Sequence, residues 1–352
     1  MMVREAIAAV AAQISLKEED ACCVMTEIIS GLATDAQIAG LITALSMKGE
    51  TEDEITGFAR AIRNGAAQVN VSGDGLVDTC GTGGDMTQTF NISTIAAFVV
   101  AACGVNVAKH GNRSVSSKCG SADVLEALGI NLKLSPAAAA GAIEKTGIGF
   151  LFAPVFHAAM KHAVRARKEV GIRTVFNLLG PLANPAGAKY QLMGVYKPEL
   201  TEPLGRVLKK LGVSAALVVH GSGGLDEAST LGETRITEVK NNRVKTYEIT
   251  PEMFDLDRVS ITDLCGGDCS SNADLALQVL EGKPGPKQDI VVLNAAAALY
   301  IAGRVKSIAE GISPAREAID SGKALQKLKL LRQYTSEVVG KEAGAENLFS
   351  TA

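Results

Sequence analysis

The chain has 352 residues, a formal net charge of −3 and 47% hydrophobic residues. This length can bury a large core and hold one large domain with a smaller one, and the charge excludes a bulk affinity for nucleic acid or anionic membrane surfaces. The seven cysteines form no disulfide or zinc-ligand pattern, which predicts reduced thiols and a cytoplasmic protein. We expect neither a signal peptide nor a membrane span.

Residues 1–66 are predicted to be helical throughout. Three candidate capping boxes start helices here, at Ser15 with Glu18, Thr34 with Gln37, and Thr51 with Glu54. Apolar residues recur at helical spacing after the second and third boxes. No residue of this segment has catalytic character, so we interpret it as a structural bundle whose spare apolar faces could form a dimer contact.

The next stretch, residues 76–128, predicts a strand, a Gly-rich turn, a helix, a second strand, a polar loop and another helix. The turn contains GTGGD at residues 81–85, the helix covers residues 95–103, and the strand covers residues 105–108. The polar loop, residues 109–117, reads KHGNRSVSS, and a helix follows from Ser121. Both polar segments follow strands, so both can lie at the carboxyl edge of an α/β sheet.

This stretch has the chemistry of a phosphate site. Glycines after a strand let backbone N–H groups approach an anion closely, and a helix N-terminus adds free donors. GTGGD alone is equally compatible with a tight turn, and it matches neither the P-loop nor the dinucleotide fingerprint. The turn, the NIST segment at residues 91–94 and the polar loop together favour phosphate binding.

Alternating strands and helices fill the rest of the chain, which predicts a mostly parallel sheet covered by helices. We expect helices at residues 155–170, 198–211, 272–280, 290–302 and 314–331, strands at 150–153, 191–196 and 215–219, and a β-hairpin at 234–249. Asp226 and Glu227 follow the strand at 215–219. An arbitrary Asp-Glu pair is usually solvated, but magnesium is often held by one or two carboxylates together with substrate phosphates.

The longer motifs of the chain resemble those of the anthranilate phosphoribosyltransferase family. The resemblance rests on GTGGD, TFNIST, KHGNRSVSS and GSADVLEALG in this order, and on FLFAP at residues 150–154, RKEVGIRTVFNLLGPLANP at 167–185 and HGSGGLDEAS at 220–229. It implies the α/β fold of the anthranilate-type nucleoside phosphorylase/phosphoribosyltransferase class. A small helical domain at residues 1–72, joined by part of about 165–190, precedes a catalytic domain at 73–352.

The resemblance also implies a reaction and a site. The phosphoribosyl group of 5-phosphoribosyl 1-pyrophosphate would pass to the amino nitrogen of anthranilate in tryptophan biosynthesis, in a homodimer formed through the helical domain. No catalytic acid or base is expected. Mg²⁺, as two ions, would be bound by Ser93, Asp226 and Glu227, and anthranilate by Gly81, Asn112 and Arg167. The phosphoribosyl pyrophosphate ligands would be Gly81, Gly84, Asp85, Thr89, Asn91, Ile92, Ser93, Thr94, Lys109, His110, Gly111, Asn112, Arg113, Ser114, Val115, Ser116, Ser117 and Ser121.

Some points stay open in the sequence. Arg165 lies two residues from Arg167, and the sequence does not show which of them points inward. His110 is as compatible with a neutral structural role as with a substrate contact. Met86, Phe156 and Cys119 depart from the family pattern. A pyrimidine nucleoside phosphorylase and a non-catalytic nucleic-acid-binding relative are the alternative functions.

Overall fold

The computed structural model describes residues 1–73, 75–84, 87–114 and 118–349, with side chains up to residue 338. The chain begins with four helices, α1 (Val3–Ala11), α2 (Glu18–Ile29), α3 (Asp35–Lys48) and α4 (Glu52–Asn64). The capping boxes predicted at Thr34 and Thr51 are present. The box predicted at Ser15 is wrong, because Lys17 is the N-cap of α2. The preceding Leu16 N–H instead donates to Oε1 of Glu54 at 2.9 Å, which holds this segment outside the helix.

Within the described residues, a sheet of seven strands follows, in the order β3-β2-β1-β4-β5-β6-β7. The strands are β1 (Val77–Gly81), β2 (Val107–Gly111), β3 (Ile148–Phe152), β4 (Tyr190–Gly194), β5 (Ala215–Gly221), β6 (Thr234–Lys240) and β7 (Arg243–Ile249). Neighbouring strands from β3 to β5 are parallel, and β6 and β7 pair antiparallel. The predicted mostly parallel sheet is therefore confirmed, as is the hairpin, whose turn residues Asn241 and Asn242 both have positive φ.

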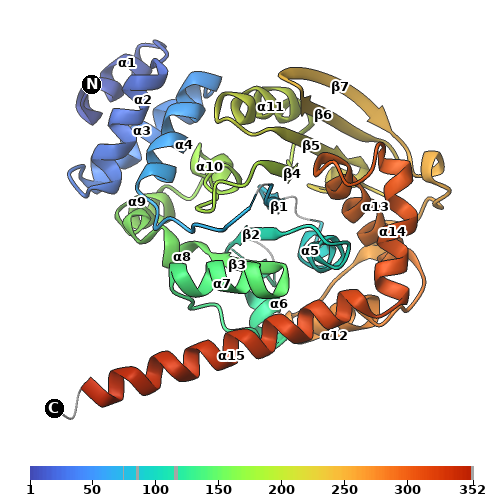
Figure 1. The fold of residues 1–352 in the computed structure, drawn as a ribbon. Helices are drawn as coiled ribbons and strands as arrows, with labels where there is room; N and C mark the ends of the chain where they lie inside the picture. The colour runs from blue at the N-terminus through green and yellow to red at the C-terminus, as the bar shows by residue number, and fades with distance from the viewer. Residues whose placement is uncertain (74, 85–86, 115–117, 350–352) are drawn as a thin grey trace.

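Helices cover both faces of the sheet (Figure 1). They are α5 (Ile92–Ala102), α6 (Ser121–Ala127), α7 (Pro136–Thr146), α8 (Ala153–Phe156), α9 (Lys161–Val170), α10 (Phe176–Leu182), α11 (Thr201–Lys210), α12 (Cys269–Leu280), α13 (Pro286–Ile301), α14 (Ile308–Asp320) and α15 (Lys323–Phe349). Short 3₁₀ turns cover Ala158–Met160, Pro198–Leu200, Ser222–Gly224, Pro251–Phe254 and Ile261–Leu264.

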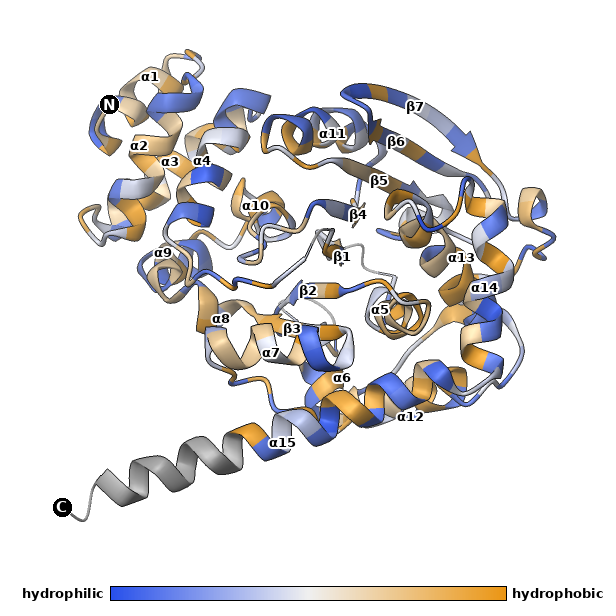
Figure 2. Cartoon of the chain, in the orientation of Figure 1, coloured by the Kyte–Doolittle hydropathy of each residue, from blue (hydrophilic) through white to orange (hydrophobic). Residues whose placement is uncertain are grey.

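Two apolar clusters lie on the two faces. One joins the sheet to α5, α7 and α12–α15, and the other joins Cys80, Met193 and Val218 of the sheet to α1–α4 and α9–α11. Apolar residues dominate α5 and α13, which are buried on nearly every side, whereas β6 and β7 alternate with polar residues (Figure 2). The described helices include none that is long and apolar enough to cross a membrane.

Two predicted helices are each broken in the structure. The segment 155–170 divides at His157, whose backbone is not helical (φ −119°, ψ 47°). The break lets the His157 ring pack edge-on against His110, with the ring centroids 5.0 Å apart. The segment 314–331 divides at Gly322, which has a φ of +74° that ends α14 and lets α15 begin in a new direction.

The second strand also ends later than predicted. Lys109, His110 and Gly111 belong to β2 rather than to the polar loop. Lys109 and His110 are only 3% and 6% exposed, because both find polar partners inside the fold. The described loop between β2 and α6 is therefore shorter than the predicted one.

Candidate active site

Four neighbouring parallel strands end in glycine at one edge of the sheet. These residues are Gly81 in β1, Gly111 in β2, Gly194 in β4 and Gly221 in β5. The chain passes from β1 to β2 on one side and returns to β4 on the other, so β1 and β4 flank the point where the strand order reverses. Open α/β sheets bind ligands at this place, beyond the carboxyl ends of the strands.

The loop that carries the acidic pair lies directly on these glycines. A Cβ on Gly194 would lie 1.5 Å from the carbonyl oxygen of Asp226, and one on Gly81 would lie 2.3 Å from Oδ2 of Asp226. Oδ2 of Asp226 in turn accepts a hydrogen bond from the backbone N–H of Gly83 at 2.8 Å. The absence of side chains at the strand ends thus lets this carboxylate reach the Gly-rich turn.

Glu227 joins the same site from the other side. Its Oε1 accepts from the backbone N–H of Ser93 at 3.1 Å, at the N-terminus of α5. The Ser93 hydroxyl lies 3.3 Å from Nζ of Lys109, and that ammonium also donates to the carbonyl of Thr79. Burial lowers the pKa of Lys109, against the attraction of nearby carboxylates, of which Asp78 acts most strongly and Glu227 and Asp226 less. A buried cation and two carboxylates therefore converge on the start of α5.

The oxygen ligands present fit magnesium better than zinc. The described residues contain no group of three or more His, Cys, Asp or Glu side chains that could hold a metal ion. The predicted ligands Ser93, Asp226 and Glu227 come together through the contacts above and offer oxygen atoms only. Magnesium commonly uses one or two carboxylates and takes its remaining ligands from water and substrate phosphates, so this incomplete set suits it.

The NIST segment is held by a chain segment that the sequence did not indicate. Thr89 forms an isolated bridge with Cys265, and Gly266 N–H donates to the carbonyl of Gln88 at 2.9 Å. Asn91 makes no helix-capping bond. Its Nδ2 donates to the Cys119 carbonyl at 3.1 Å, and its Oδ1 accepts from Nδ2 of Asn272, also at 3.1 Å. Asn272 has no local motif that would mark it.

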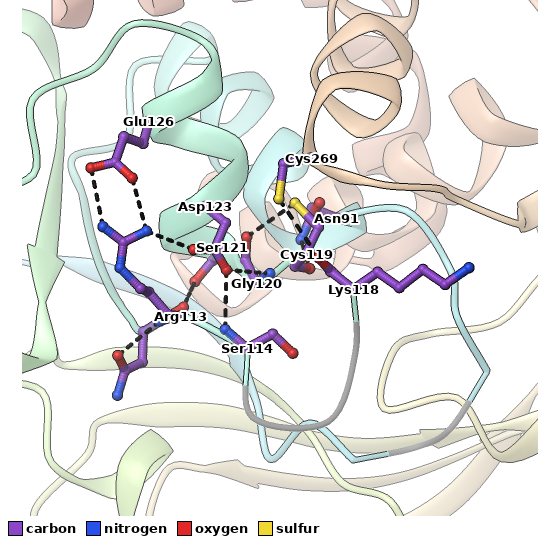
Figure 3. Close-up of polar contacts among 11 residues, drawn as sticks. Asn91, Arg113, Ser114, Lys118, Cys119, Gly120, Ser121, Asp123, Glu126 and Cys269 are labelled. Carbon is purple, nitrogen blue, oxygen red and sulfur yellow. Dashed lines mark hydrogen bonds and ion pairs between the residues drawn. The ribbon is translucent and has the colours of Figure 1, made fainter.

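Only some of the predicted phosphate ligands lie beside the acidic pair. The others are buried in the fold, lie near the start of α6, or fall outside the described residues. Ile92 and Thr94 are buried, and Thr94 lines a small cavity inside the fold with Phe98 and Leu125. Gly84 accepts a hydrogen bond from Arg173, a contact that the sequence did not predict. Arg113, Ser114 and Ser121 lie around the start of α6 (Figure 3), and the Asn112 carbonyl joins them by accepting from the Ser121 hydroxyl at 3.2 Å. Asp85, Val115, Ser116 and Ser117 lie outside the described residues.

His110 points to the opposite face of the sheet from Lys109. Its Nδ1 lies 3.1 Å from the carbonyl of Gly180 in α10, and because a carbonyl only accepts, Nδ1 carries the proton. Burial, together with a smaller contribution from neighbouring His157, lowers the pKa of His110 to about 3. Burial likewise lowers the pKa of His157 to about 4. Both rings are neutral near pH 7, so neither brings a positive charge to a phosphate.

The structure distinguishes the two arginines of α9. Arg165 is exposed and pairs with Glu169 at 2.9 Å and with Asp35 at 3.6 Å. Arg167 is half-buried, with its guanidinium 4.8 Å from the centre of the Phe176 ring, and burial lowers its pKa. Among the described residues no carboxylate pairs with Arg167. Arg167 is therefore the more buried of the two arginines, and it packs on an aromatic ring rather than on a carboxylate.

Asp78 is a buried acid that the sequence analysis missed, since it lies within an apolar strand. It accepts from Nδ2 of Asn184 at 2.8 Å and from the His110 N–H at 3.1 Å. Burial raises its pKa to about 6, although Lys109 and these hydrogen bonds act in the opposite direction. Asp78 thus connects the central strands to the segment after α10.

Comparisons with known proteins agree with this geometry. Residues 4–66 match the helical bundle domain of a glycosyl transferase family, and residues 73–325 match the α/β domain of a glycosyl transferase family. The chain is 53% identical over 336 residues to the anthranilate phosphoribosyltransferase of Syntrophobacter fumaroxidans, covering 96% of this chain and 100% of that protein. It is 53% identical over 350 residues to the enzyme of Geobacter sulfurreducens, with the same coverage.

Solved structures give the same result. The anthranilate phosphoribosyltransferase of Thermus thermophilus matches with a TM-score of 0.90 and 45% identity, over 94% of this chain and 99% of that chain. The Saccharomyces cerevisiae enzyme in complex with phosphoribosyl pyrophosphate and Mg matches with a TM-score of 0.87 and 28% identity, over 95% and 98%. The chain therefore belongs to the anthranilate phosphoribosyltransferase family of glycosyl transferases.

Proposed function

We propose that the protein transfers the phosphoribosyl group of 5-phosphoribosyl 1-pyrophosphate to the amino nitrogen of anthranilate, releasing pyrophosphate, as a step of tryptophan biosynthesis. The observation that carries the proposal is the convergence of Asp226, Glu227, Ser93 and Lys109 at the strand ends. Family membership supports it, because related enzymes carry this name and the yeast enzyme has been solved with phosphoribosyl pyrophosphate and Mg and with 4-fluoroanthranilate. These relatives give no support to the phosphorylase or nucleic-acid-binding alternatives.

The site residues would act on the pyrophosphate end of the substrate. The Gly-rich turn and the N-terminus of α5 supply backbone N–H donors, and Lys109 supplies a buried positive charge. Asp226, Glu227 and the Ser93 hydroxyl would hold Mg²⁺, for which we propose two ions. When held by these residues, magnesium would supply positive charge to neutralise the charge that develops on pyrophosphate as the C1–O bond breaks.

Arg167 would bind the second substrate. Its half-buried guanidinium has no acidic partner among the described residues, and a charge-assisted hydrogen bond to the anthranilate carboxylate would supply one. Asn112 and Gly81 remain proposed anthranilate contacts. The amine of anthranilate is already a neutral nucleophile, so the reaction needs positioning and charge stabilisation rather than a catalytic base.

We further infer that the protein is a cytoplasmic homodimer formed through its helical bundle. Leu32 and Met47 of the bundle are 72% and 80% exposed in the single chain. Large exposed apolar side chains often mark a surface that a partner subunit covers. All seven cysteines are free thiols, as in proteins of a reducing compartment. Light scattering of the purified protein tests the dimer, and a monomeric mass at micromolar concentration would refute it.

The activity is tested by the loss of anthranilate fluorescence on mixing with phosphoribosyl pyrophosphate, with and without Mg²⁺. We expect loss only when all three components are present with the protein. The doubly substituted variant Asp226→Asn/Glu227→Gln should require far more Mg²⁺ and turn over slowly. If the folded wild-type protein leaves the fluorescence unchanged, the transferase proposal is wrong, and an unaltered magnesium requirement in the variant would contradict the metal role of the acidic pair.

A further inference from the structure

We propose that Asp123 is a positioning residue for phosphoribosyl pyrophosphate binding, and that Arg113 acts through it rather than as a phosphate ligand. This inference rests on the proposed function and deepens it. It concerns the two ends of the connection between β2 and α6, residues 111–114 and 118–120, which we call the loop ends. Asp123 lies in the first turn of α6, next to both of them (Figure 3).

The Asp123 carboxylate ties the two loop ends together. Its Oδ2 accepts from the backbone N–H of Gly120 at 2.9 Å and from that of Ser114 at 3.2 Å. Its Oδ1 accepts from Nη1 of Arg113 at 2.7 Å. The side chain is 17% exposed, so these bonds are only partly screened by water. One carboxylate thus fixes donors from both sides of the proposed phosphate loop.

The loop ends are also in direct backbone contact. A Cβ on Gly120 would lie 2.3 Å from the Ser114 nitrogen and 2.9 Å from the Asn112 carbonyl oxygen. That carbonyl accepts from the Ser121 hydroxyl and from the Ala122 N–H, each at 3.2 Å. The approach brings backbone N–H groups of both ends to one carboxylate. An amide at this position would keep only one acceptor oxygen and lose the charge, so it could not make both the backbone bonds and the Arg113 contact at full strength.

Arg113 is turned toward α6 and its charge is already matched. Nη1 also contacts Oε2 of Glu126 at 2.8 Å, and Nη2 donates to Oε1 of Glu126 at 3.1 Å. Two carboxylates pair with the single guanidinium, so its charge is already engaged and is not free for a phosphate. The fork geometry of the guanidinium suits a bidentate carboxylate. The arrangement assigns Arg113 to holding Asp123 and the start of α6.

The first experiment measures binding of phosphoribosyl pyrophosphate by calorimetry at fixed Mg²⁺, together with steady-state kinetics. We expect Asp123→Asn to weaken binding of phosphoribosyl pyrophosphate about 10-fold while the Tm changes little. The matched control is Glu310→Gln, a carboxylate that likewise accepts a backbone N–H, from Lys306 at 3.0 Å, at the start of the distant helix α14. The control should bind as the wild type does.

The second experiment separates positioning from direct contact. If Arg113 acts through Asp123, the double variant Arg113→Ala/Asp123→Asn should bind no worse than the weaker single variant, within twofold, because the two residues form one unit. Arg113→Lys should lose as much as Arg113→Ala, since lysine cannot reproduce the fork. If Arg113 instead contacted a phosphate directly as a point charge, the Arg113→Lys variant would largely keep its affinity for phosphoribosyl pyrophosphate.

Several results would overturn the inference. One is unchanged binding of phosphoribosyl pyrophosphate in Asp123→Asn. Another is a loss in the double variant equal to the product of the two single losses. A third is a loss of binding in Asp123→Asn that accompanies a large fall in Tm. Failure of the proposed function looks different. Wild-type protein that binds phosphoribosyl pyrophosphate but transfers nothing to anthranilate refutes the transferase proposal and leaves the binding comparison valid, whereas wild-type protein that does not bind it refutes both.

Discussion

Gly194, the last residue of β4, sets how closely the acidic pair lies on the strand ends. A Cβ at this position would lie 1.5 Å from the Asp226 carbonyl oxygen, whereas ordinary contacts begin at 3.4 Å. Gly194→Ala therefore requires a relative shift of about 2 Å between the strand and the Asp226 backbone. The backbone cannot avoid this contact by a rotamer change, so the carboxylates of Asp226 and Glu227 must move with it.

The expected effect is on catalysis. A misplacement of about 1 Å can cost about 100-fold in rate, so we expect kcat/KM for phosphoribosyl pyrophosphate to fall by at least about 100-fold, or roughly 2.7 kcal/mol of transition-state stabilisation. The magnesium concentration for half-maximal rate should rise as well. Gly81→Ala should also impair magnesium use, because its Cβ would lie 2.3 Å from Oδ2 of Asp226 and would turn this proposed magnesium ligand away from Gly83.

The assay is the fluorescence-monitored transfer reaction, with magnesium titrated for each variant. Gly40→Ala is the matched control, because a Cβ on this α3 residue meets only Cδ1 of Ile7, at 3.9 Å. Circular dichroism should show that the Gly194→Ala protein is folded. If the folded Gly194→Ala variant turns over as fast as the wild type and needs no more magnesium, then Gly194 does not set the position of the acidic pair.

Two further predictions concern the second substrate and the buried histidines. Arg167→Ala should raise the KM for anthranilate about 10- to 100-fold through the loss of a charged hydrogen bond, and Arg165→Ala should not; similar KM values in both variants would contradict the assignment. The folded protein keeps His110 and His157 neutral, with pKa values of about 3 and about 4, whereas the unfolded chain binds protons below about pH 6.5. The stability that they contribute is present above pH 6.5 and is lost as the pH falls, by about 2 kcal/mol from each residue between pH 6.5 and 5. Urea unfolding of the wild type and of His157→Asn checks this, and equal pH dependence of the two unfolding free energies would contradict it.

The parts of the fold that were predictable are those with a local chemical cause. Thr34 and Thr51 start helices because their hydroxyls accept the N–H groups of Gln37 and Glu54, and those partners are visible in the sequence. The Asn241-Asn242 turn follows from the tolerance of asparagine for positive φ. Such signals involve residues only a few positions apart, so they need no knowledge of the tertiary structure.

The parts that were missed depend on distant partners. Lys109 reads as the start of a loop, because a lysine inside a strand is acceptable only when partners such as the Thr79 carbonyl and the Ser93 hydroxyl surround it. Arg167 is half-buried because its guanidinium packs on the Phe176 ring, and Arg165 is exposed in part because it pairs with Asp35. None of these contacts leaves a periodic or local pattern.

The same limit applies to the candidate site. The motifs indicated the acidic pair, the Gly-rich turn and Ser93, and the structure brings these together. Asp123 lies within the GSADVLEALG motif, which gave it no role, and Asn272 lies in no motif. Only the folded chain shows that Asp123 holds the loop ends and that Asn272 holds the NIST segment. The roles of all these residues in binding remain predictions for the experiments above.

The apolar cluster shared by the helical bundle and the sheet has a consequence for how the protein unfolds. Phe58 of α4, Leu179 of α10 and Val218 of β5 belong to one continuous set of buried side chains. Removal of the bundle would leave one face of the central strands in contact with water. Unfolding of the strands would likewise expose the apolar side chains of the bundle that pack against them. Heat should therefore melt both in one cooperative transition, and neither piece should persist alone as a folded fragment.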